Sequence, residues 1–455
     1  MSWLGITGDA VLILLGVLVA RAAISTARTP QGAAAWVVFL VSFPLLALPA
    51  FALFGSVARL NRRTDDRHKP LSHGATGGGR LAELHAITLT EAVPGNDLHL
   101  LVDGRATFDA MFEAIDAAEH EIVLQSYIVR ADAVGLALRD RLIAAAGRGV
   151  KVRMLCDMLG SAFLGLRYGR ALARAGVELR GTAGPYRKLG RIGLNFRNHR
   201  KTLVVDGRTG FIGGINLARE YVDGGKAFAS WRDTHLRVEG PMTRHLRDLF
   251  AADWKAVTGE ALPPPPELPG LPEPHENSVT GLVTGFGPTD SMERGSLLLC
   301  GLVALARRRL WIATPYLVPH ADLVTALQLA VLRGVDVRFL VPAPSDNLLA
   351  WYASRGYGLS QAGLGIDVYE YEPGFMHQKV MLIDDDIASV GTVNIDIRSA
   401  LLNFEVTALV EDAGFAARIE AMLTADFARA RRLEPPGAWH VRLLAPVARL
   451  FAPLL

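Results

Sequence analysis

Apolar positions recur along most of the chain in two patterns, short strand-like runs and longer stretches with helical spacing. In the first half these patterns predict, in order, a helix over 106–118, a strand over 121–127, a helix over 135–147, a strand over 150–156, a further helix and a strand near 177–179. Strands that alternate with helices are typical of α/β proteins, in which helices cover the faces of a sheet. The sequence therefore predicts an α/β sandwich.

The second half of the chain repeats the pattern of the first. Arg-Gly-Val-Asp-Val-Arg at 333–338 matches Arg-Gly-Val-Lys-Val-Arg at 148–153, and Gly-Ile-Asp-Val at 365–368 matches Gly-Val-Glu-Leu at 176–179. A proline-rich stretch, 262–274, separates the halves and is typical of a stiff connector. The repeat is too long for a solenoid and indicates duplicated domains. We expect a first domain at 81–258, a connector at 259–278 and a second domain at 279–455.

The N-terminal region is apolar enough to predict membrane segments. Residues 32–57 carry no charged side chain, and a helix that rises about 1.5 Å per residue crosses a hydrocarbon core of roughly 30 Å within such a length. An earlier run at 4–24 is weaker, because Asp9 and Arg21 bracket its apolar centre. It either spans the membrane with its flanks or is a signal-like segment. The sequence thus predicts a helical membrane hairpin within residues 1–60, with spans at 4–24 and 33–57.

A basic and glycine-rich linker at 61–80 follows the predicted hairpin. Basic residues lie mainly after the second span, at Arg59, Arg62, Arg63, Arg67 and Lys69. This asymmetry predicts that the bulk of the chain lies in the cytoplasm, against the inner leaflet. The same cluster either attracts anionic lipid head groups or is only a topology signal.

Composition narrows the function only a little. Half of the 455 residues are apolar and the formal net charge is +3, so charge alone predicts no broad nucleic-acid-binding patch. Cys156 and Cys300 lie in apolar runs, which favours reduced buried thiols over a disulfide or a metal site. The sequence contains no Cys/His cluster with the spacing of a zinc site, and we predict no metal.

One chemical motif, His-x-Lys-x4-Asp, occurs twice with the same internal spacing. Each copy is followed by a turn of small residues that ends in asparagine, so the two sets are His199, Lys201, Asp206 and Asn216, then His377, Lys379, Asp384 and Asn394. Residues i and i+2 of a strand share a face, so each His and Lys project together. Lysine supplies positive charge and asparagine supplies donors, as a phosphate site needs. Two imidazoles suit covalent phosphoryl transfer.

The two motifs and their turns resemble the phospholipase D superfamily, and further segments are similar to its bacterial cardiolipin synthases. These segments are 33–36, 125–128, 231–235, 314–319, 403–405 and 452–455. The resemblance covers essentially the whole chain. Thr392 stands where serine is more usual, but it keeps the hydroxyl. The resemblance implies two duplicated α/β/α domains with pseudo-two-fold symmetry, whose motifs meet at the interface.

The resemblance also implies roles for the site residues. His199 is the nucleophile and forms a phosphohistidine, and His377 gives a proton to the leaving alcohol and later takes one from the acceptor. Both lysines and both asparagines hold the non-bridging oxygens, without a cofactor or divalent metal. Glu405 orients His199 and Asp233 orients His377, or the two carboxylates only end strands as salt-bridged groups. Asp206 and Asp384 belong to the signature but hold the turn after each strand.

Three functions fit these features. The first is phosphatidyl transfer between two phosphatidylglycerol molecules, which gives cardiolipin and glycerol at the bacterial inner membrane in a multi-pass protein. The second is a phospholipase D that uses water or another alcohol, which the catalytic residues do not distinguish from the first. The third is a nucleic-acid phosphodiesterase, which the hairpin disfavours. We expect a phospholipid substrate, a membrane and no nucleic acid as partners. Residues 441–455 form either a membrane-surface helix or part of the domain packing.

Overall fold

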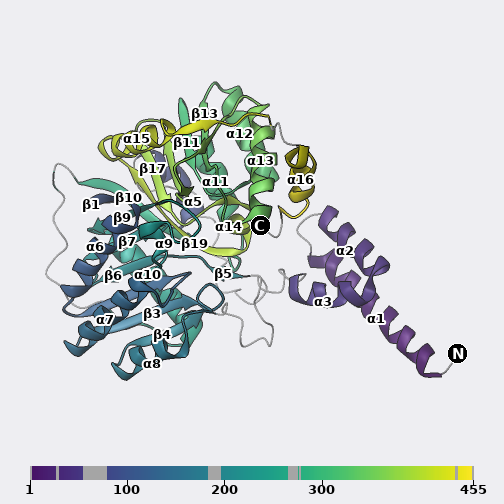
Figure 1. Cartoon of the computed structure of the whole chain (residues 1–455), viewed down its shortest axis with the longest axis horizontal. Helices are drawn as coiled ribbons and strands as arrows, with labels where there is room; N and C mark the ends of the chain where they lie inside the picture. The colour runs from purple at the N-terminus through teal and green to yellow at the C-terminus, as the bar shows by residue number, and fades with distance from the viewer. Residues whose placement is uncertain are drawn as a thin grey trace. The chain divides into compact units, whose positions relative to one another are not determined.

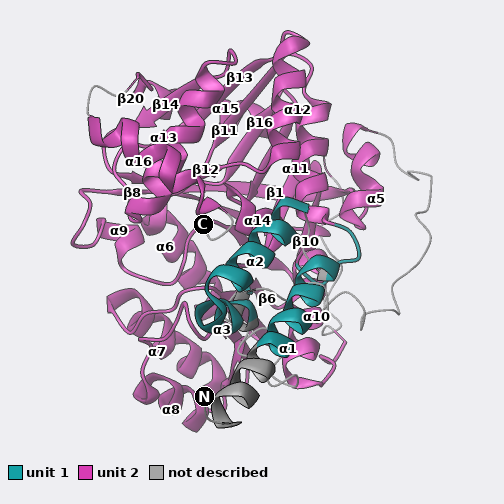
Figure 2. Cartoon of the chain, turned by 90° about the vertical axis from the view of Figure 1, so that its right-hand side faces the viewer, with its two compact units in different colours: residues 1–70, 183–197, 288–292 teal, residues 71–182, 198–287, 293–455 magenta. Residues whose placement is uncertain are grey.

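The computed structural model describes residues 3–26, 30–54, 79–182, 196–264, 275, 278–435 and 439–452, with side chains left out at 3–12, 26 and 52–54. The chain forms two compact units (Figure 2). The first comprises residues 1–70, 183–197 and 288–292, and the second comprises 71–182, 198–287 and 293–455. The second unit contains both copies of the motif.

The first unit consists of three apolar helices, α1 (Trp3–Thr26), α2 (Pro30–Ser42) and α3 (Pro44–Phe54). They pack on one another, with the ring of Trp36 edge-on to Phe51 at 5.1 Å. In the part of the chain that the structure describes, none of the helices combines the length and apolar character that a bilayer crossing requires. The predicted hairpin with spans at 4–24 and 33–57 is therefore not supported by the structure.

Proline explains the break in the second predicted span. Pro44 has no N–H to continue the ladder of α2, so that helix ends at Ser42 and a new one begins at Pro44. The ladder resumes when the N–H of Ala47 donates to the carbonyl of Phe43 at 2.8 Å. In the first span, the charges of Asp9 and Arg21 leave only a short apolar centre. Residues 55–57 of the prediction and 61–78 of the linker lie outside the described residues.

The first half of the second unit alternates strands and helices as the sequence predicted. Its elements are η2 (Arg80–Leu84), α5 (His85–Thr88), β1 (Val93–Val102), α6 (Asp103–Asp116), β2 (Glu121–Ser126), α7 (Ala133–Gly147), β3 (Lys151–Asp157), α8 (Leu166–Arg174), β4 (Glu178–Thr182), β5 (Arg197–Asn198), β6 (Thr202–Val205), β7 (Thr209–Gly213), α9 (Glu220–Asp223), β8 (Trp231–Arg232), β9 (Thr234–Glu239) and α10 (Met242–Thr258). The predicted helices at 106–118 and 135–147 correspond to α6 and α7, and the predicted strands to β2, β3 and β4.

The second half follows the same succession. Its elements are β10 (Val279–Phe286), α11 (Arg294–Leu305), β11 (Arg309–Ala313), β12 (Leu317–Val318), α12 (Ala321–Leu332), β13 (Asp336–Pro342), α13 (Leu348–Ala362), β14 (Asp367–Tyr371), β15 (Phe375–Met376), β16 (Val380–Ile383), β17 (Ile387–Gly391), β18 (Ile395–Asp396), α14 (Ile397–Leu401), β19 (Asn403–Glu411), α15 (Ala413–Phe427), β20 (Ala430–Arg432) and α16 (Trp439–Arg449). Most of the predicted connector, 265–274 and 276–277, lies outside the described residues.

One continuous sheet joins the two halves. Its order is β20-β14-β13-β11-β16-β17-β19-β10-β1-β9-β7-β6-β2-β3-β4. Apart from β20, the order from β14 to β10 matches the order from β4 to β1 strand for strand. The halves meet where β1 runs antiparallel to β10, with Val93 opposite Gly281 and Asn96 opposite Val279. The two motif strands, β6 and β16, therefore occupy equivalent places on either side of this junction.

Helices cover both faces of the sheet, so the fold is a layered α/β arrangement (Figure 1). On one face α10 and α15 contribute Leu246, Phe250 and Leu423 to a core that is common to both halves. On the other face α6 and α7 cover the first half, and α11 and α12 cover the second. Cys156 on β3 is a buried free thiol, as expected, whereas Cys300 on α11 is free but only partly buried. The mixed α/β class predicted from the sequence is confirmed.

The C-terminal helix α16 has two apolar faces. Ala448, together with Ala452 just after the helix, is buried in a cluster with Val318 and Ala353, which fixes the helix on the domain. The other side of the helix exposes large apolar side chains at Trp439, Leu443, Leu444 and Val447, and Leu450 just after the helix is exposed as well. Pro446 lies inside the helix without ending it. The packing expected for 441–455 is thus seen on one face of the described part of this segment, and the membrane-surface alternative stays a prediction.

Candidate active site

Each His-x-Lys pair lies at the start of a buried strand. Lys201 immediately precedes β6 and Lys379 immediately precedes β16. The ammonium of Lys201 donates to the carbonyl of His199 at 2.6 Å, and that of Lys379 donates to the carbonyl of His377 at 2.5 Å. All four side chains are buried. The i, i+2 spacing thus places an imidazole and an ammonium together in each half.

The first imidazole is held by a carboxylate from the other half. Nδ1 of His199 lies 3.0 Å from Oε2 of Glu405, whose side chain is fully buried. The hydroxyl of Thr392 donates to the same oxygen at 2.5 Å, and the amide of Asn403 donates to the other at 3.2 Å. The backbone sets this pairing, because the N–H of His199 donates to the carbonyl of Phe404 at 2.9 Å.

The second imidazole mirrors the first. Nδ1 of His377 lies 2.8 Å from Oδ2 of Asp233, and the N–H of His377 donates to the carbonyl of Arg232 at 2.7 Å. The other oxygen of Asp233 accepts the N–H of Thr234 at 2.8 Å. Gly214 gives this carboxylate its space, since a Cβ there would lie 2.1 Å from Oδ1. The crosswise arrangement is therefore the one that the sequence resemblance implied.

Burial and mutual charge set the protonation of the imidazoles. Burial lowers the pKa of His199, and the charge of Glu405 opposes this effect. Burial lowers the pKa of His377 well below its usual value, and the charges of Lys379, Lys201 and His199 lower it further. Nζ of Lys379 lies 2.8 Å from Nδ1 of His377, which accounts for its effect. The lowered pKa values favour the neutral form of both rings at rest.

The carboxylates differ in a way that distinguishes the two histidines. Burial raises the pKa of Glu405, but the charge and hydrogen bond of His199 and further donors outweigh it and leave the pKa below its ordinary value. Burial raises the pKa of Asp233 to about 6, against the opposing charge of Lys379. Glu405 thus remains ionised behind His199 at neutral pH, which favours a proton on Nδ1 and a free lone pair on Nε2.

The two lysines belong to one electrostatic site. Burial lowers the pKa of Lys201 to about 7 and that of Lys379 to about 8. The charge of Lys379 lowers the pKa of Lys201 further, whereas Glu405 raises the pKa of both. Because the charges of each half act on groups of the other, the two motifs converge. An anion placed between them would favour the charged form of both ammonium groups.

The motif asparagines line the same region but are already engaged. The amide nitrogen of Asn216 donates to the hydroxyl of Tyr221 at 2.6 Å, and its oxygen accepts the N–H of Ile128 at 3.1 Å. The side chain of Asn394 hydrogen-bonds to Asp396, the N-cap of α14, whereas its own buried oxygen has no hydrogen-bond partner within the described residues. Both asparagines are buried. Their role in holding phosphate oxygens remains a proposal.

The motif aspartates lie at the far ends of the strands. Asp206 is five residues beyond Lys201, so about 16 Å of extended chain separates the Cα atoms of the two residues. It accepts the N–H groups of Glu119, His120 and Glu121 at 2.8–2.9 Å, in a left-handed conformation with φ of 52°.

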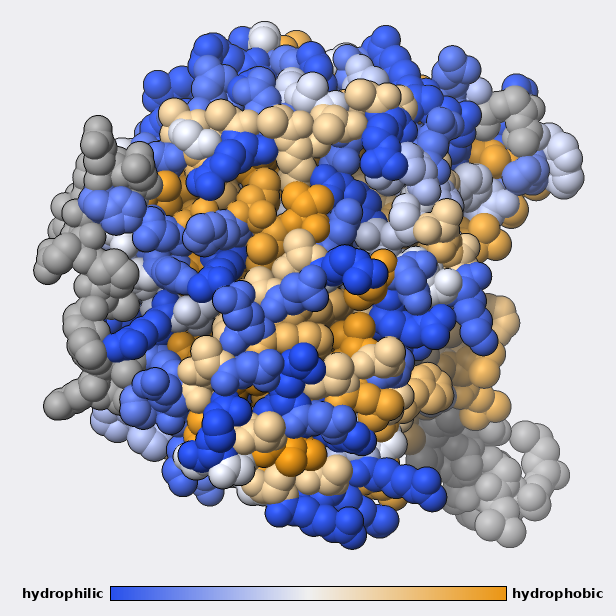
Figure 3. Space-filling view, turned by 60° about the vertical axis from the view of Figure 1, so that its left-hand side comes forward, coloured by the Kyte–Doolittle hydropathy of each residue, from blue (hydrophilic) through white to orange (hydrophobic). Residues whose placement is uncertain are grey.

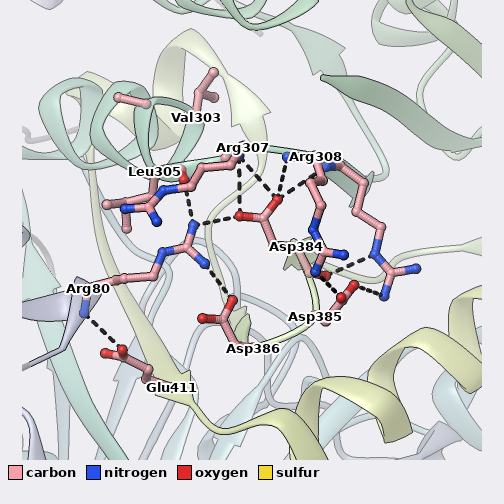
Figure 4. Close-up of polar contacts among 12 residues, drawn as sticks. Arg80, Val303, Leu305, Arg307, Arg308, Asp384, Asp385, Asp386 and Glu411 are labelled. Atoms are coloured by element: carbon pink, nitrogen blue, oxygen red, sulfur yellow. Dashed lines mark hydrogen bonds and ion pairs between the residues drawn. The ribbon is translucent and has the colours of Figure 1, made fainter. Parts of the chain in front are cut away.

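Asp384 does the same at the end of β16, with φ of 53° and with the N–H groups of Arg307, Arg308 and Arg309 as donors. Arg80 adds an ion pair to it at 2.6 Å (Figure 4). Neither motif aspartate contacts a motif histidine or lysine; instead each holds the start of a neighbouring strand. This placement agrees with the structural role suggested in the sequence analysis for both residues.

Aromatic side chains that the motif does not predict enclose the imidazoles. The ring of Tyr127 lies edge-on to His199 at 5.0 Å, and Tyr221 and Trp231 lie 5.8 and 5.7 Å from the ring of His377. Tyr221 carried no signal, because its position depends on the short helix α9. These rings exclude water and strengthen electrostatic interactions in the site.

The arrangement fits two-step transfer of a phosphoryl-containing group. It holds two neutral imidazoles, each backed by a carboxylate, and two ammonium groups whose charge suits a phosphodiester. Comparison with known proteins agrees with this chemistry. A family model described as "Cardiolipin synthase, PLD-like domain" matches residues 111–254 and 299–427.

Named relatives cover almost the whole chain. It is 40% identical over 466 residues to "Cardiolipin synthase A" of Pseudomonas aeruginosa (strain LESB58), which covers 97% of this chain and 94% of that protein. It is 37% identical to "Cardiolipin synthase A" of Pseudomonas putida (strain W619), with coverage of 97% and 96%.

Two solved structures share the fold at low sequence identity. A phosphatidylserine synthase from Haemophilus influenzae Rd KW20 superposes with a TM-score of 0.56 at 15% identity, over 78% of this chain and 93% of that one. A polyphosphate kinase from Porphyromonas gingivalis gives a TM-score of 0.51 at 15% identity, over 85% and 58%. At such identity the likeness concerns the fold alone.

Proposed function

Because the chain belongs to the cardiolipin synthases with phospholipase D-like domains, we propose that it joins two phosphatidylglycerol molecules into cardiolipin and releases glycerol. The observation that carries the proposal is the crosswise pairing of the imidazoles. Each histidine depends on a carboxylate from the other half, at 3.0 Å for His199 and 2.8 Å for His377. Such a pair suits a covalent intermediate formed by one ring while the other moves a proton.

In the first step, Nε2 of His199 attacks the phosphorus of the first lipid. The bond from phosphorus to the glycerol head group breaks, and protonated His377 gives its proton to the departing oxygen. Ionised Glu405 stabilises the positive charge that develops on His199. Since burial lowers the pKa of His377, its protonated form is a strong acid, and the incoming phosphodiester charge supplies the electrostatic gain for protonating it.

In the second step, a hydroxyl of the second phosphatidylglycerol attacks the same phosphorus. The phosphorus–nitrogen bond to His199 breaks, and His377 takes the hydroxyl proton. Lys201 and Lys379 stabilise the negative charge on the non-bridging oxygens in both transition states, with Asn216 and Asn394 as neighbouring donors. The two ammonium groups supply positive charge that a metal ion provides in other phosphoryl-transfer sites.

We also propose that residues 81–258 and 279–455 are duplicated domains. The equivalent strand orders on either side of the β1–β10 pair support this division. Because the sheet is continuous, both halves belong to one compact unit. Duplication accounts for the two motifs and for a site that draws one imidazole from each copy.

We propose that the protein works at the inner membrane, in contact with the lipid surface. The face of the molecule in Figure 3 mixes hydrophilic residues with groups of hydrophobic ones. The outward side of the C-terminal segment exposes Leu443 on α16 and Leu450 just after it, and the exposed residue Arg442 is next to Leu443, a combination that suits anionic lipid. In a flotation assay, Leu443→Ser with Leu450→Ser should weaken binding to phosphatidylglycerol vesicles. Unchanged binding would remove α16 from the membrane contact.

The test of the catalytic proposal is product analysis with labelled phosphatidylglycerol and full-length protein in vesicles. The wild type should form cardiolipin and glycerol, and His199→Ala should abolish both, together with any acid-labile phosphoenzyme. His120→Ala serves as a control, because that half-exposed imidazole lies at a turn. Phosphatidic acid without cardiolipin would identify a hydrolase instead. Normal turnover by His199→Ala would exclude that residue as the nucleophile.

A further inference from the structure

An acidic side chain stands at the outer end of the site. Asp346 lies in the turn between β13 and α13, and its two carboxylate oxygens accept the hydroxyl of Tyr316 at 2.8 and 2.7 Å. Asp346 is exposed, whereas the catalytic side chains are buried. Burial lowers the pKa of Lys379, and Asp346 is among the carboxylates that oppose this effect. Leu317 pairs with Ile395 where β12 runs parallel to β18, so Tyr316, which holds this carboxylate, adjoins the motif residue Asn394.

The equivalent position in the first half is occupied by a serine, whose hydroxyl makes different contacts. Matching 333–338 with 148–153 places Ser161 opposite Asp346. The hydroxyl of Ser161 donates to the carbonyl of Tyr127 at 3.2 Å and accepts the N–H of Val129 at 3.0 Å. Ser161 thus serves the main chain of its own loop. The first half also has a carboxylate that acts on its motif lysine, Asp157, but that side chain is buried and accepts the N–H groups of Leu159 and Gly160. Among the described residues, the two sides of the site therefore differ in that the carboxylate of Asp346 is exposed.

A carboxylate at this position does not favour binding of the lipid phosphate group. Like charges repel, and an ionised carboxylate can only accept hydrogen bonds. The groups that act on Asp346 are the hydroxyl of Tyr316, backbone N–H groups of its own turn and, through charge, Lys379. A neutral ligand that presents hydroxyl groups therefore fits beside it better than a second anion does.

We propose that Asp346, positioned by Tyr316, binds the head-group glycerol of the acceptor lipid through the hydroxyl that does not react. This inference rests on the proposed function and assigns the acceptor side of the same site. The neighbouring primary hydroxyl then attacks the phosphorus, the bond to Nε2 of His199 breaks, and the hydroxyl proton passes to His377. Asp346 forms and breaks no covalent bond; it selects acceptors that carry a second hydroxyl beside the reacting one.

The experiment compares two soluble acceptors that differ in that second hydroxyl. Full-length protein in phosphatidylglycerol vesicles receives labelled glycerol or labelled propan-1-ol, and transfer to each is measured. Losing a hydrogen bond to a charged group should reduce transfer to glycerol by about tenfold to a hundredfold in Asp346→Asn. Transfer to propan-1-ol should change by less than about threefold, since only the shared phosphate chemistry is involved. Tyr316→Phe should show a smaller loss with the same preference.

Asp140→Asn makes the same replacement at an exposed carboxylate on α7 and should leave both rates unchanged. Equal losses for the two alcohols in Asp346→Asn would reveal a structural effect and overturn the proposal, as would an unchanged ratio. The proposed function is judged separately by the wild type. A wild type that transfers to both alcohols without forming cardiolipin would refute the synthase, and the ratio in Asp346→Asn would still decide the acceptor subsite.

Discussion

Replacing Glu405 by glutamine is the sharpest test of the crosswise site. The change removes one negative charge and keeps the shape of the side chain. In the structure, Oε2 of Glu405 faces Nδ1 of His199 at 3.0 Å and the hydroxyl of Thr392 at 2.5 Å, and Oε1 accepts from Asn403 at 3.2 Å. The variant therefore probes charge at a position where the hydrogen-bond partners are known.

The fold can accommodate the glutamine. If its oxygen replaces Oε2, its amide nitrogen faces the amide of Asn403. The oxygen of Asn403 has no hydrogen-bond partner within the described residues, so a flip of that amide restores a donor and an acceptor. We expect Glu405→Gln to unfold within a few degrees of the wild type.

The catalytic loss should be far larger than the loss of stability. A hydrogen bond to a buried charged group contributes about 1.5–3 kcal/mol, which corresponds to roughly 10- to 150-fold in rate. A glutamine amide can also donate to Nδ1 and stabilise the wrong imidazole tautomer, for which losses of about 10⁴-fold are known in a serine-protease triad. We therefore expect the rate of glycerol release to fall by about 10²- to 10⁴-fold.

Rapid-quench measurement of glycerol release from labelled phosphatidylglycerol isolates the first step. Thr392→Ser provides the matched control, because it keeps the hydroxyl that donates to Glu405, and should retain activity within about threefold. A Glu405→Gln variant that releases glycerol at a wild-type rate would refute the idea that an ionised carboxylate activates His199. Loss of activity that merely follows loss of folded protein would refute it equally.

Two further predictions concern the charges and the spacing of the site. The pKa of Lys201 is about 7 and that of Lys379 about 8, so a rise in pH through these values removes the ammonium charges. We therefore expect kcat/KM to fall between about pH 7 and about pH 9. A flat profile in this range would contradict the role of the two lysines as charged groups. Gly214→Ala would place a Cβ 2.1 Å from the carboxylate oxygen beside the second imidazole and should lower activity by about a hundredfold, as expected when a catalytic group moves by about 1 Å. Gly147→Ala, with open space around it, should be neutral, and activity in Gly214→Ala equal to that control would show that this contact is unimportant.

The local features of the site follow from sequence because they depend on short-range geometry. The i, i+2 spacing of His199 and Lys201 fixes a common face, and a buried strand follows as expected. The pairing of His199 with Glu405 joins residues far apart in the chain. No periodicity encodes that contact, and only the family resemblance suggested it.

Other features could not be predicted, because they depend on turns and packing. The position of Tyr221 depends on α9, and that of Asp346 on the turn before α13. The membrane prediction rested on the absence of charge across 32–57, whereas the helix breaks at Pro44. Hydropathy measures what a segment prefers to contact, but helix length depends on a continuous hydrogen-bond ladder.

The antiparallel seam between β1 and β10, together with the exchange of carboxylates across it, has a consequence for synthesis of the protein. A nascent chain that has emerged only as far as residue 264 carries His199 but lacks Glu405, which is encoded near the far end of the message. Such a fragment holds an unactivated nucleophile, so the growing polypeptide cannot attack lipid before its last third is made. Separately expressed halves should regain turnover only when mixed, because each half supplies the carboxylate that pairs with the histidine of the other.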